Sequence, residues 1–243
     1  MNFKSKIKLW TAIGLCAGFA LQAGNGFCAA TGASFLKVDP SPRTYALGGS
    51  NALLSLGAEA LSGNPANLGI ARKKFELFTS FSNLIDNEQF SHVAIALNRS
   101  TVRTHFIEAG GVSMTRLSSG GLEGRDKTGA KTGSSFGSED RAFSFSAATL
   151  IGSDLRLGLT GKTIQSEIAG YSSKLSFAGD LGMNYQFRNF SFPLAMGLAL
   201  RNFGQPVQYL AQRDPLPTAL ELPISVGAGH LVGLFGAQHE IST

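Results

Sequence analysis

The feature that most constrains this chain is a period of two that returns in segment after segment from Phe75 onward. In LSFAGDLGMNYQF (residues 175–187) the odd positions are apolar or glycine, whereas the even positions are small or polar. The segments LRLGLTGKT (155–163) and FPLAMGLALRN (192–202) alternate in the same way. Because successive side chains of a β-strand point to opposite faces, the pattern predicts strands with one apolar face and one small or polar face.

The alternation predicts about eight strands, at residues 75–83, 90–98, 104–115, 141–150, 155–166, 175–187, 191–202 and 222–232. Residues 118–140 contain Gly, Ser and charged residues without a period, which predicts a long mobile loop. Residues 203–221 contain Pro206, Pro215 and Pro217, so this connection is also expected to lie outside the sheet.

An alternating all-β chain of this kind is either a membrane barrel or a soluble β-sandwich. Here the apolar faces are long, and the opposite faces carry small residues with an occasional charge rather than a row of solvent-facing side chains. We therefore expect a transmembrane antiparallel β-barrel. Beyond the first 30 residues no run of 18 apolar residues occurs, so no transmembrane helix is expected.

The first 30 residues have the layout of a secretory signal peptide. Lys4, Lys6 and Lys8 precede an apolar run from Leu9 to Leu21, and small residues follow up to Ala30. The run is shorter than the roughly 20 residues that a spanning helix needs. We expect residues 1–30 to be cleaved; a retained anchor or a lipoprotein is the alternative.

Loss of the leader changes the chemistry that the chain can carry. Both cysteines, Cys16 and Cys28, lie in the leader, so disulfides, thiol nucleophiles and cysteine metal sites are excluded from the mature chain. Three lysines also leave, so 18 of the 21 basic residues remain against 16 acidic ones, a net charge of +2. This balance gives no support for nucleic-acid binding.

The search for catalytic and metal-binding motifs finds none, so we expect no enzyme, no catalytic residue, no metal site and no cofactor. The segment GLTGKT resembles a phosphate-binding loop, but Arg156 stands where that loop needs glycine, and the segment alternates as a strand. The four histidines are scattered without the spacing of metal ligands.

The stretch LSGNPANLGI (residues 61–70) predicts a short helix before the first strand. Asn64 is a good N-cap, and Pro65 fits the first helical position because its missing N–H has no partner to lose there. The preceding residues 46–61 have helical spacing. We therefore divide the mature chain into a helical hatch, residues 31–72, which is expected inside the barrel, and the barrel itself, residues 73–243.

Residues 32–69, GASFLKVDPSPRTYALGGSNALLSLGAEALSGNPANLG, resemble the N-terminal segment of the PorV/PorQ family of FadL-like outer-membrane proteins. The resemblance rests on the Gly-Ala-x-Phe-Leu start, on Arg43 followed by Gly48 and Gly49, and on Asn64-Pro65-Ala66. Segments GDLGMNYQ and PLPTAL match further family motifs in order. The resemblance implies a barrel plugged by the hatch, with Arg43, Gly48, Gly49, Asn64, Pro65 and Ala66 as structural rather than catalytic residues.

Eight strands are too few for this arrangement, because a barrel of eight is just filled by its own side chains. The chain ends at GLFGAQHEIST without a terminal strand that closes on an aromatic residue. We therefore expect a C-terminally incomplete barrel, truncated or frameshifted around Leu231. The alternatives are an open sheet that another chain completes and a shorter relative with a different fold.

Three charged residues on the small or polar faces are expected to meet inside the barrel. If hairpins turn near Gly170 and near Arg188, both Lys162 and Arg201 lie opposite Ala178, and Asp180 is diagonal to each of them. We predict a cluster of Lys162, Asp180 and Arg201 in the lumen. It either compensates charge in a wet interior or contacts the hatch or a cargo.

The resemblance implies two functions, both in the outer membrane and in contact with its lipid. In the first, the protein resembles the secretion members, which act as shuttles that bind type IX secretion cargo and its attachment machinery. In the second, it resembles the members that carry hydrophobic small molecules across the outer membrane. A structural barrel or a degenerate fragment is the remaining alternative.

Overall fold

The computed structural model describes residues 31–47, 49, 51–70, 73–85, 88–98, 106–126, 128–209, 212–228 and 231–240. The expected signal peptide therefore lies outside the described residues. Five short helices come first: η1 (Ser34–Lys37), α2 (Pro42–Ala46), α3 (Asn51–Leu54), η2 (Gly57–Ser62) and η3 (Pro65–Ile70). Twelve strands follow: β1 (Phe75–Asn83), β2 (Glu88–Asn98), β3 (Ala109–Arg125), β4 (Lys131–Ile151), β5 (Leu155–Ile168), β6 (Tyr171–Ser172), β7 (Ser176–Phe187), β8 (Leu194–Gly204), β9 (Val207–Tyr209), β10 (Gln212–Asp214), β11 (Ala219–Ala228) and β12 (Leu231–Glu240).

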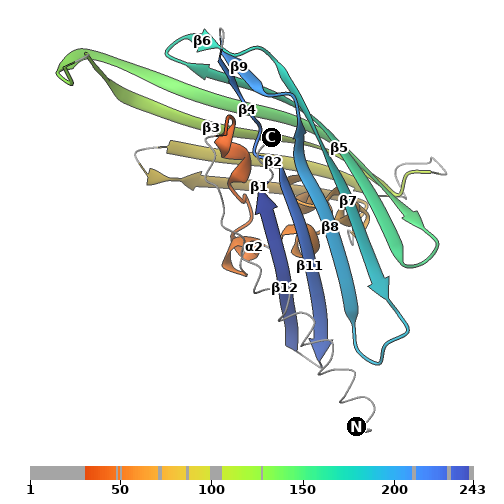
Figure 1. Ribbon diagram of the computed structural model, residues 1–243. Coiled ribbons are helices and arrows are strands. Elements are labelled where there is room, and N and C mark those ends of the chain that lie inside the picture. The colour runs from red at the N-terminus through yellow and green to blue at the C-terminus, as the bar shows by residue number, and fades with distance from the viewer. Residues whose placement is uncertain are drawn as a thin grey trace.

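The chain is an all-β protein built on one antiparallel sheet, as the alternation predicts. The strands follow the order β1-β2-β3-β4-β5-β7-β8-β11-β12, so each long strand pairs with the next one along the chain (Figure 1). The short strand β6 extends the edge of β5, and β9 and β10 form a separate hairpin. Such a meander needs only short connections between neighbouring strands.

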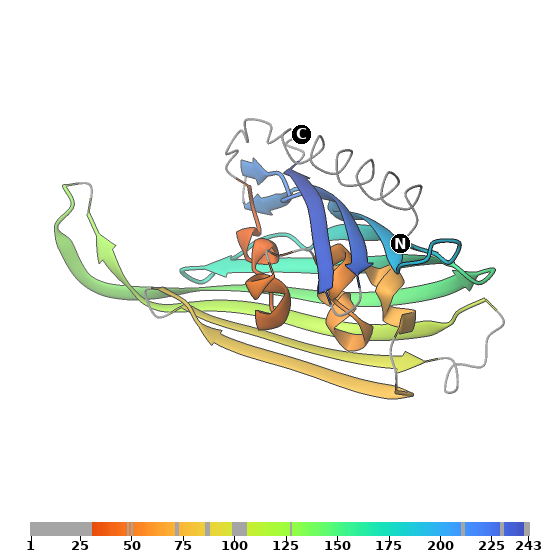
Figure 2. The ribbon, with the colours of Figure 1, turned by 90° about the horizontal axis from the view of Figure 1, so that it is seen from below.

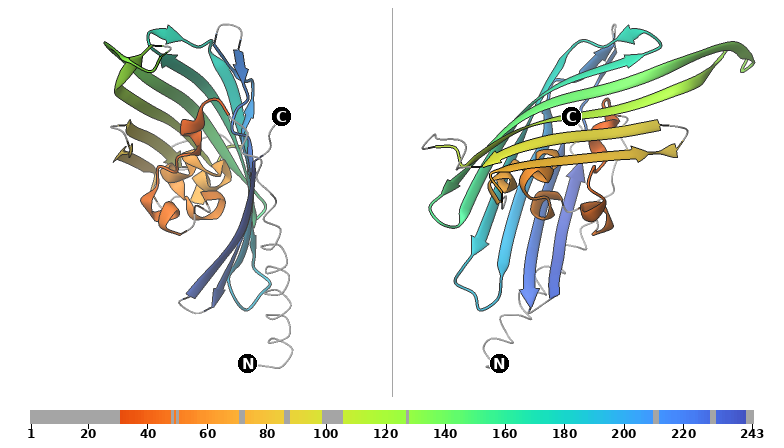
Figure 3. Two further views of the ribbon diagram at one scale, coloured as in Figure 1. Left: turned by 60° about the vertical axis from the view of Figure 1, so that its left-hand side comes forward. Right: turned by 180° about the vertical axis from the view of Figure 1, so that it is seen from behind.

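The sheet curves around the helices but does not close into a barrel. The helices of the hatch lie on its concave side, as two views show (Figures 2 and 3). Among the described strands, β1 and β12 form the two edges, and neither has a neighbour on its outer side. The described part of the chain is therefore an open, curved sheet with the hatch in its hollow.

The loop predicted at residues 118–140 is wrong in its extent. β3 and β4 continue as a paired ribbon to Arg125 and Lys131, with register irregularities after Ser119 and Glu123. Most of the side chains described in this ribbon are exposed on both faces. An apolar period arises only where one face is buried, so a strand pair that is exposed on both sides leaves no such signal.

The last predicted strand, residues 222–232, also needs correction. β11 begins at Ala219 and ends at Ala228, and a further strand, β12, begins at Leu231. Pro223 lies within β11 and faces Gly236 of β12. Residues 203–221 lie only partly outside the main sheet, because β8 runs to Gly204 and β11 takes up the last three residues.

The two faces of the sheet have the reverse of the polarity found in a water-soluble sheet protein. On the convex face, Phe81 is 73% exposed, Phe145 66% and Leu159 56%. The concave face under the hatch buries polar side chains, namely Ser80, His92, Ser113, Ser144, Ser146, Thr160, Lys162, Asp180, Asn184, Arg201 and Glu221. None of the helices in the described ranges is long and apolar enough to span a membrane.

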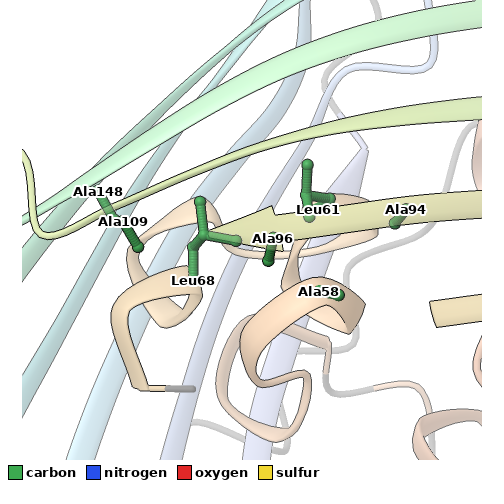
Figure 4. Close-up of a cluster of buried hydrophobic side chains, with 7 residues drawn as sticks. All are labelled: Ala58, Leu61, Leu68, Ala94, Ala96, Ala109 and Ala148. Atoms are coloured by element: carbon green, nitrogen blue, oxygen red, sulfur yellow. The ribbon is translucent and has the colours of Figure 1, made fainter. Parts of the chain in front are cut away.

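Two small apolar clusters fill the space between the hatch and the sheet. In the first, Ala58, Leu61 and Leu68 of η2 and η3 pack on the strands (Figure 4), where they meet Ala94, Ala96, Ala109 and Ala148. In the second, Phe35 of η1 packs with Ala142, Ile164, Val207 and Leu216. Alanine on the strand side lets the helices approach the sheet closely, which explains why the inner faces carry small residues.

Candidate functional site

The Asn64-Pro65-Ala66 tripeptide lies on a floor made by two glycines. Gly158 of β5 and Gly182 of β7 are direct partners across the two strands. A Cβ atom on Gly158 would stand 2.2 Å from the Ala66 nitrogen, and one on Gly182 would stand 2.0 Å from Asn64 Oδ1. No side chain fits at these positions, so the hatch backbone contacts the sheet backbone directly.

Asn64 holds the hatch by hydrogen bonds in two directions. Its side-chain amide donates to the carbonyl of Ala52 in the hatch at 2.8 Å and to the carbonyl of Met183 in β7 at 3.0 Å. Its Oδ1 accepts from the Ala66 nitrogen at 3.0 Å, next to Pro65 at the start of η3. Both polar atoms of this fully buried side chain are therefore hydrogen-bonded: Oδ1 caps η3, and the amide nitrogen joins η3 to the rest of the hatch and to β7.

Two further asparagines, one in η3 and one in β7, add to the contact between the hatch and the sheet. The Asn184 amide of β7 donates to Asn67 Oδ1 of η3 at 2.7 Å, and the Asn67 amide donates to the carbonyl of Ala52 at 3.0 Å. We call Asn64, Pro65, Ala66, Asn67, Gly158, Gly182 and Asn184 the hatch seat. Four of its members were not predicted: Asn67, Gly158, Gly182 and Asn184. The sequence feature that could have identified Gly158 and Gly182 was the presence of glycine on the inner faces of two neighbouring strands.

The other predicted hatch residues act within the hatch. Arg43 pairs with Glu59 at 2.9 Å and also donates to the carbonyl of Leu54, which ties α2 to η2 and to α3. Gly49 takes a left-handed φ of 74°, and its nitrogen donates to the carbonyl of Thr44 at 2.8 Å, which closes the end of α2. Gly48 lies outside the described residues.

Of the predicted lumen cluster, Lys162 and Asp180 lie together and Arg201 lies apart. Lys162 Nζ is 2.7 Å from Asp180 Oδ2, and Lys162 faces Ala178 across β5 and β7, in the register expected from the sequence. The expected position of Arg201 opposite Ala178 is wrong, because Gly204 lies there. Between β7 and β8 the register shifts, so that Asp180 faces both Arg201 and Asn202.

The shift is a β-bulge, and Asn202 supplies the third member of the cluster. Asn202 has a φ of 56°, a left-handed conformation that asparagine adopts more readily than most residues. Its nitrogen donates to Asp180 Oδ1 at 2.8 Å, and its Oδ1 accepts from Lys162 at 2.8 Å. The Thr218 hydroxyl donates to the carbonyl of Asn202 at 3.0 Å, so the bulge also holds the connection that leads into β11.

Arg201 forms a separate pair with Glu221 of β11, with Nη2 and Oε1 2.5 Å apart. It also donates to the carbonyl of Ser62 in the hatch at 3.3 Å. Both interior ion pairs are buried and mutually neutralised, and each includes hydrogen bonds to neighbouring groups. These contacts join neighbouring strands and the hatch, and removal of one partner would leave an uncompensated buried charge.

Comparison of the chain with protein-family models gives no match. No curated protein matches it either. The resemblance to the PorV/PorQ family therefore rests on the motifs quoted above.

Proposed function

We propose that this protein is an outer-membrane β-sheet protein that binds secreted cargo, in the manner of the secretion members of the PorV/PorQ family. In this role the protein has no chemistry of its own. Its partners are the lipid of the outer membrane, type IX cargo proteins and the secretion machinery, and nucleic acid is not among them.

The inverted polarity of the sheet is the observation that carries the proposal. Large apolar side chains such as Phe81, Phe145 and Leu159 are exposed, whereas the polar and charged side chains of the concave face are buried. A surface of this kind is unfavourable in water but fits the hydrocarbon of a bilayer. The expected leader would direct such a chain across the inner membrane.

The interior favours binding of cargo over transport of a hydrophobic small molecule. A lipid-like molecule needs an apolar route, but the concave face carries buried polar side chains and the hatch seat occupies it. The hatch is joined to the sheet by backbone contact at Gly158 and Gly182, so displacing it would break several hydrogen bonds at once. The FadL-like transporter is therefore the second candidate.

The first test determines where the tagged protein lies in its native host and which proteins and lipids co-purify with it. Outer membranes are isolated, solubilised in detergent and used for a pull-down that is read by intact and native mass spectrometry. We expect the chain in the outer membrane together with secreted proteins that share a C-terminal sorting domain. Recovery of a lipid-like molecule alone would favour the transporter, and a water-soluble chain would contradict both.

A matched pair of variants makes the membrane part of the proposal specific. Leu159→Lys places a charge on the exposed apolar face of β5, at a cost of about 2–4 kcal/mol if that face meets the bilayer midplane. Glu123→Lys changes charge on an exposed part of β3 that is not expected in the bilayer. Integration should fail only for the first variant. Equal integration of both would show that the apolar face does not contact lipid.

A further inference from the structure

Four aromatic rings form a continuous chain at the turn between β7 and β8. Tyr185 lies edge-on to Phe187, with their ring centroids 4.6 Å apart. Phe190 continues the chain at 6.0 Å from Phe187 and 5.5 Å from Phe192. Tyr185 and Phe187 belong to the outward-facing row of β7 that also holds Leu181. The rings therefore continue the exposed apolar face of the sheet into the turn, and we call residues 185–192 the aromatic turn.

The aromatic turn also carries a charge. Arg188 lies within it, and its side chain is 64% exposed. Its Nε is 2.5 Å from Asp154 Oδ1, and its Nη2 donates to the carbonyl of Ser153 at 2.8 Å, which joins this turn to the turn between β4 and β5. Phe190 in the same turn is 43% exposed. Water disfavours the exposed rings and hydrocarbon disfavours the exposed ion pair, so the boundary between the two suits both.

Further exposed aromatic residues lie where other strands begin or end on this side. Leu155 at the start of β5 faces Tyr185, so the aromatic turn is level with the turn between β4 and β5. Phe75 begins β1, directly after the exposed Lys74. Phe106 precedes β3 and is 86% exposed. Aromatic residues with charged residues just beyond them are typical of the level at which a membrane protein meets the lipid head groups.

At the opposite end of the strands, the apolar face stops at a row of charged residues. Along β4 the outward row runs from Phe143 to Arg141, which faces Arg116 of β3. Glu139 accepts hydrogen bonds from both guanidinium groups, and all three side chains remain partly exposed. Beyond this row lies the ribbon of residues 119–137, at the end of the sheet opposite to the aromatic turn (Figure 1). Because exposed charges are costly in hydrocarbon, the apolar band ends between Phe143 and Arg141.

The distance between these two limits fits a bilayer. On β5 the outward row carries no charged or amide side chain from Leu155 to Thr163, and Gln165 and Glu167 follow. At roughly 3.4 Å per residue, this stretch is about 27 Å long. The usual strand tilt of about 40° reduces the height to about 20 Å, which is near the apolar band of about 25 Å found in outer-membrane proteins.

We propose that the aromatic turn is an interfacial anchor that lies among the lipid head groups at one face of the bilayer, and that the ribbon of residues 119–137 projects into water beyond the other face. Movement along the bilayer normal would bring either Arg188 into hydrocarbon or Phe190 into water, so the turn holds the sheet at one depth. Because the anchor rests on the membrane location proposed above, it fails if that location fails, but it adds the depth and the direction of insertion.

The test measures the depth of three single tryptophans. The one tryptophan of the chain, Trp10, lies in the expected leader, so Trp10→Phe provides a background without tryptophan. In this background Phe190→Trp reports on the aromatic turn, Leu159→Trp on the apolar face and Phe136→Trp on the ribbon. Each full chain is purified and reconstituted into phosphatidylcholine vesicles whose acyl chains carry bromine either near the head group or near the bilayer centre.

We expect bromine near the head group to cause the largest loss of fluorescence in the Phe190→Trp chain, and bromine near the centre to do so in the Leu159→Trp chain. The Phe136→Trp chain should lose fluorescence to iodide in the water but not to bromine. Strongest quenching of Phe190→Trp from the centre, or none while Leu159→Trp is quenched, would overturn the anchor and leave the membrane location standing. Absence of bromine quenching in all three chains would contradict the membrane location itself.

A matched pair of variants tests whether the rings set the depth. Phe190→Ser combined with Phe192→Ser removes two rings of the aromatic turn, whereas Ser191→Ala changes the exposed residue between them and removes no ring. In the Leu159→Trp chain, we expect the double variant to shift the ratio of quenching by the two bromine positions, and Ser191→Ala to leave it unchanged. The same ratio in both variants would overturn the anchoring role of the rings.

Discussion

The interior under the hatch and the ribbon of residues 119–137, which we call the arm, are both built from paired strands and both carry ion pairs. Under the hatch, Lys162 and Asp180 are 8% and 1% exposed in their side chains. In the arm region, Glu123 pairs with Lys131, and these side chains are 53% and 62% exposed. The charges are of the same types, but their surroundings are opposite.

We expect burial, rather than the number of contacts, to set how much each ion pair contributes to the free energy of unfolding. An exposed pair exchanges hydration for a screened attraction and gains little. A buried pair that loses one partner leaves a charge without water and without compensation. We therefore expect the same kind of change to have a large effect under the hatch and a small one in the arm.

The largest effect is expected from Asp180→Ala. The variant leaves Lys162 buried without its carboxylate and removes the acceptor for the Asn202 nitrogen, so the free energy of unfolding should fall by about 3–5 kcal/mol. Glu123→Ala in the arm should cost no more than about 1 kcal/mol. Urea unfolding of both variants in one detergent measures the difference. Similar losses would show that the interior is wetter than its burial indicates.

The next effect is expected at the hatch seat. Gly158→Ala places a Cβ atom against backbone atoms of Pro65 and Ala66, which cannot rotate away, so the free energy of unfolding should fall by about 1–3 kcal/mol or more. In the arm, Gly120 has no neighbouring atom within 4 Å of a Cβ, and Gly120→Ala should be close to neutral. Equal stability of the two variants would mean that the hatch does not contact β5.

Asn64→Ala tests the capping of the seat separately from its packing. The variant leaves the carbonyl of Met183 without this donor and removes the cap of η3, which should lower the free energy of unfolding by about 1–3 kcal/mol. Hydrogen exchange of residues 57–70 should accelerate. Unchanged exchange would indicate that the glycine floor alone holds the hatch.

Shortening the arm should leave the sheet intact. Replacing residues 121–136 by an Asn-Gly turn should change the free energy of unfolding by less than about 1 kcal/mol, because an isolated two-stranded ribbon contributes little stability of its own. The same variant shows whether the arm takes part in cargo binding. A large loss of stability would contradict the view that the arm is independent of the interior.

The smallest effect is expected at the tip of the arm and depends on pH. The side-chain hydroxyl of Thr128, followed by the backbone nitrogens of Thr128 and Ala130, lowers the pKa of Asp126 below its usual value of 3.8. A lowered pKa stabilises the folded turn above the ordinary value, and this contribution is lost as the pH falls through the folded-state pKa. Titration of Asp126 by NMR should give a midpoint below 3.8, and Thr128→Ala should raise it.

Several parts of the fold and the site follow from local signals in the sequence. The alternation predicts the all-β class and places the apolar side chains on one face. Asn64 and Pro65 predict the start of η3, because a cap depends on residues only two or three positions apart. The contact of Lys162 with Asp180 follows from a hairpin register, and β5 and β7 are joined by a short connection.

Other parts lie beyond local reasoning. The arm has no apolar period, since neither of its faces is covered. Asn67 and Asn184 are 117 residues apart, and only the folded chain brings their amides together. The displaced position of Arg201 has two causes: β7 and β8 pair two residues away from the expected register, so that Leu181 faces Leu200, and one extra residue in β8 adds a further shift.

The sequence by itself determined the strand period, the polarity of the two faces and the helical segment ahead of the strands, because each depends on residues that are close along the chain. Only the tertiary structure decided that Gly158 and Gly182 receive the hatch and that Arg201 pairs with Glu221. The position of Arg201 is set next to the left-handed bulge at Asn202, and the seating of the hatch depends on contacts between segments that are far apart in the sequence. The interaction energies of these contacts arise only when the strands have taken their positions in the folded chain.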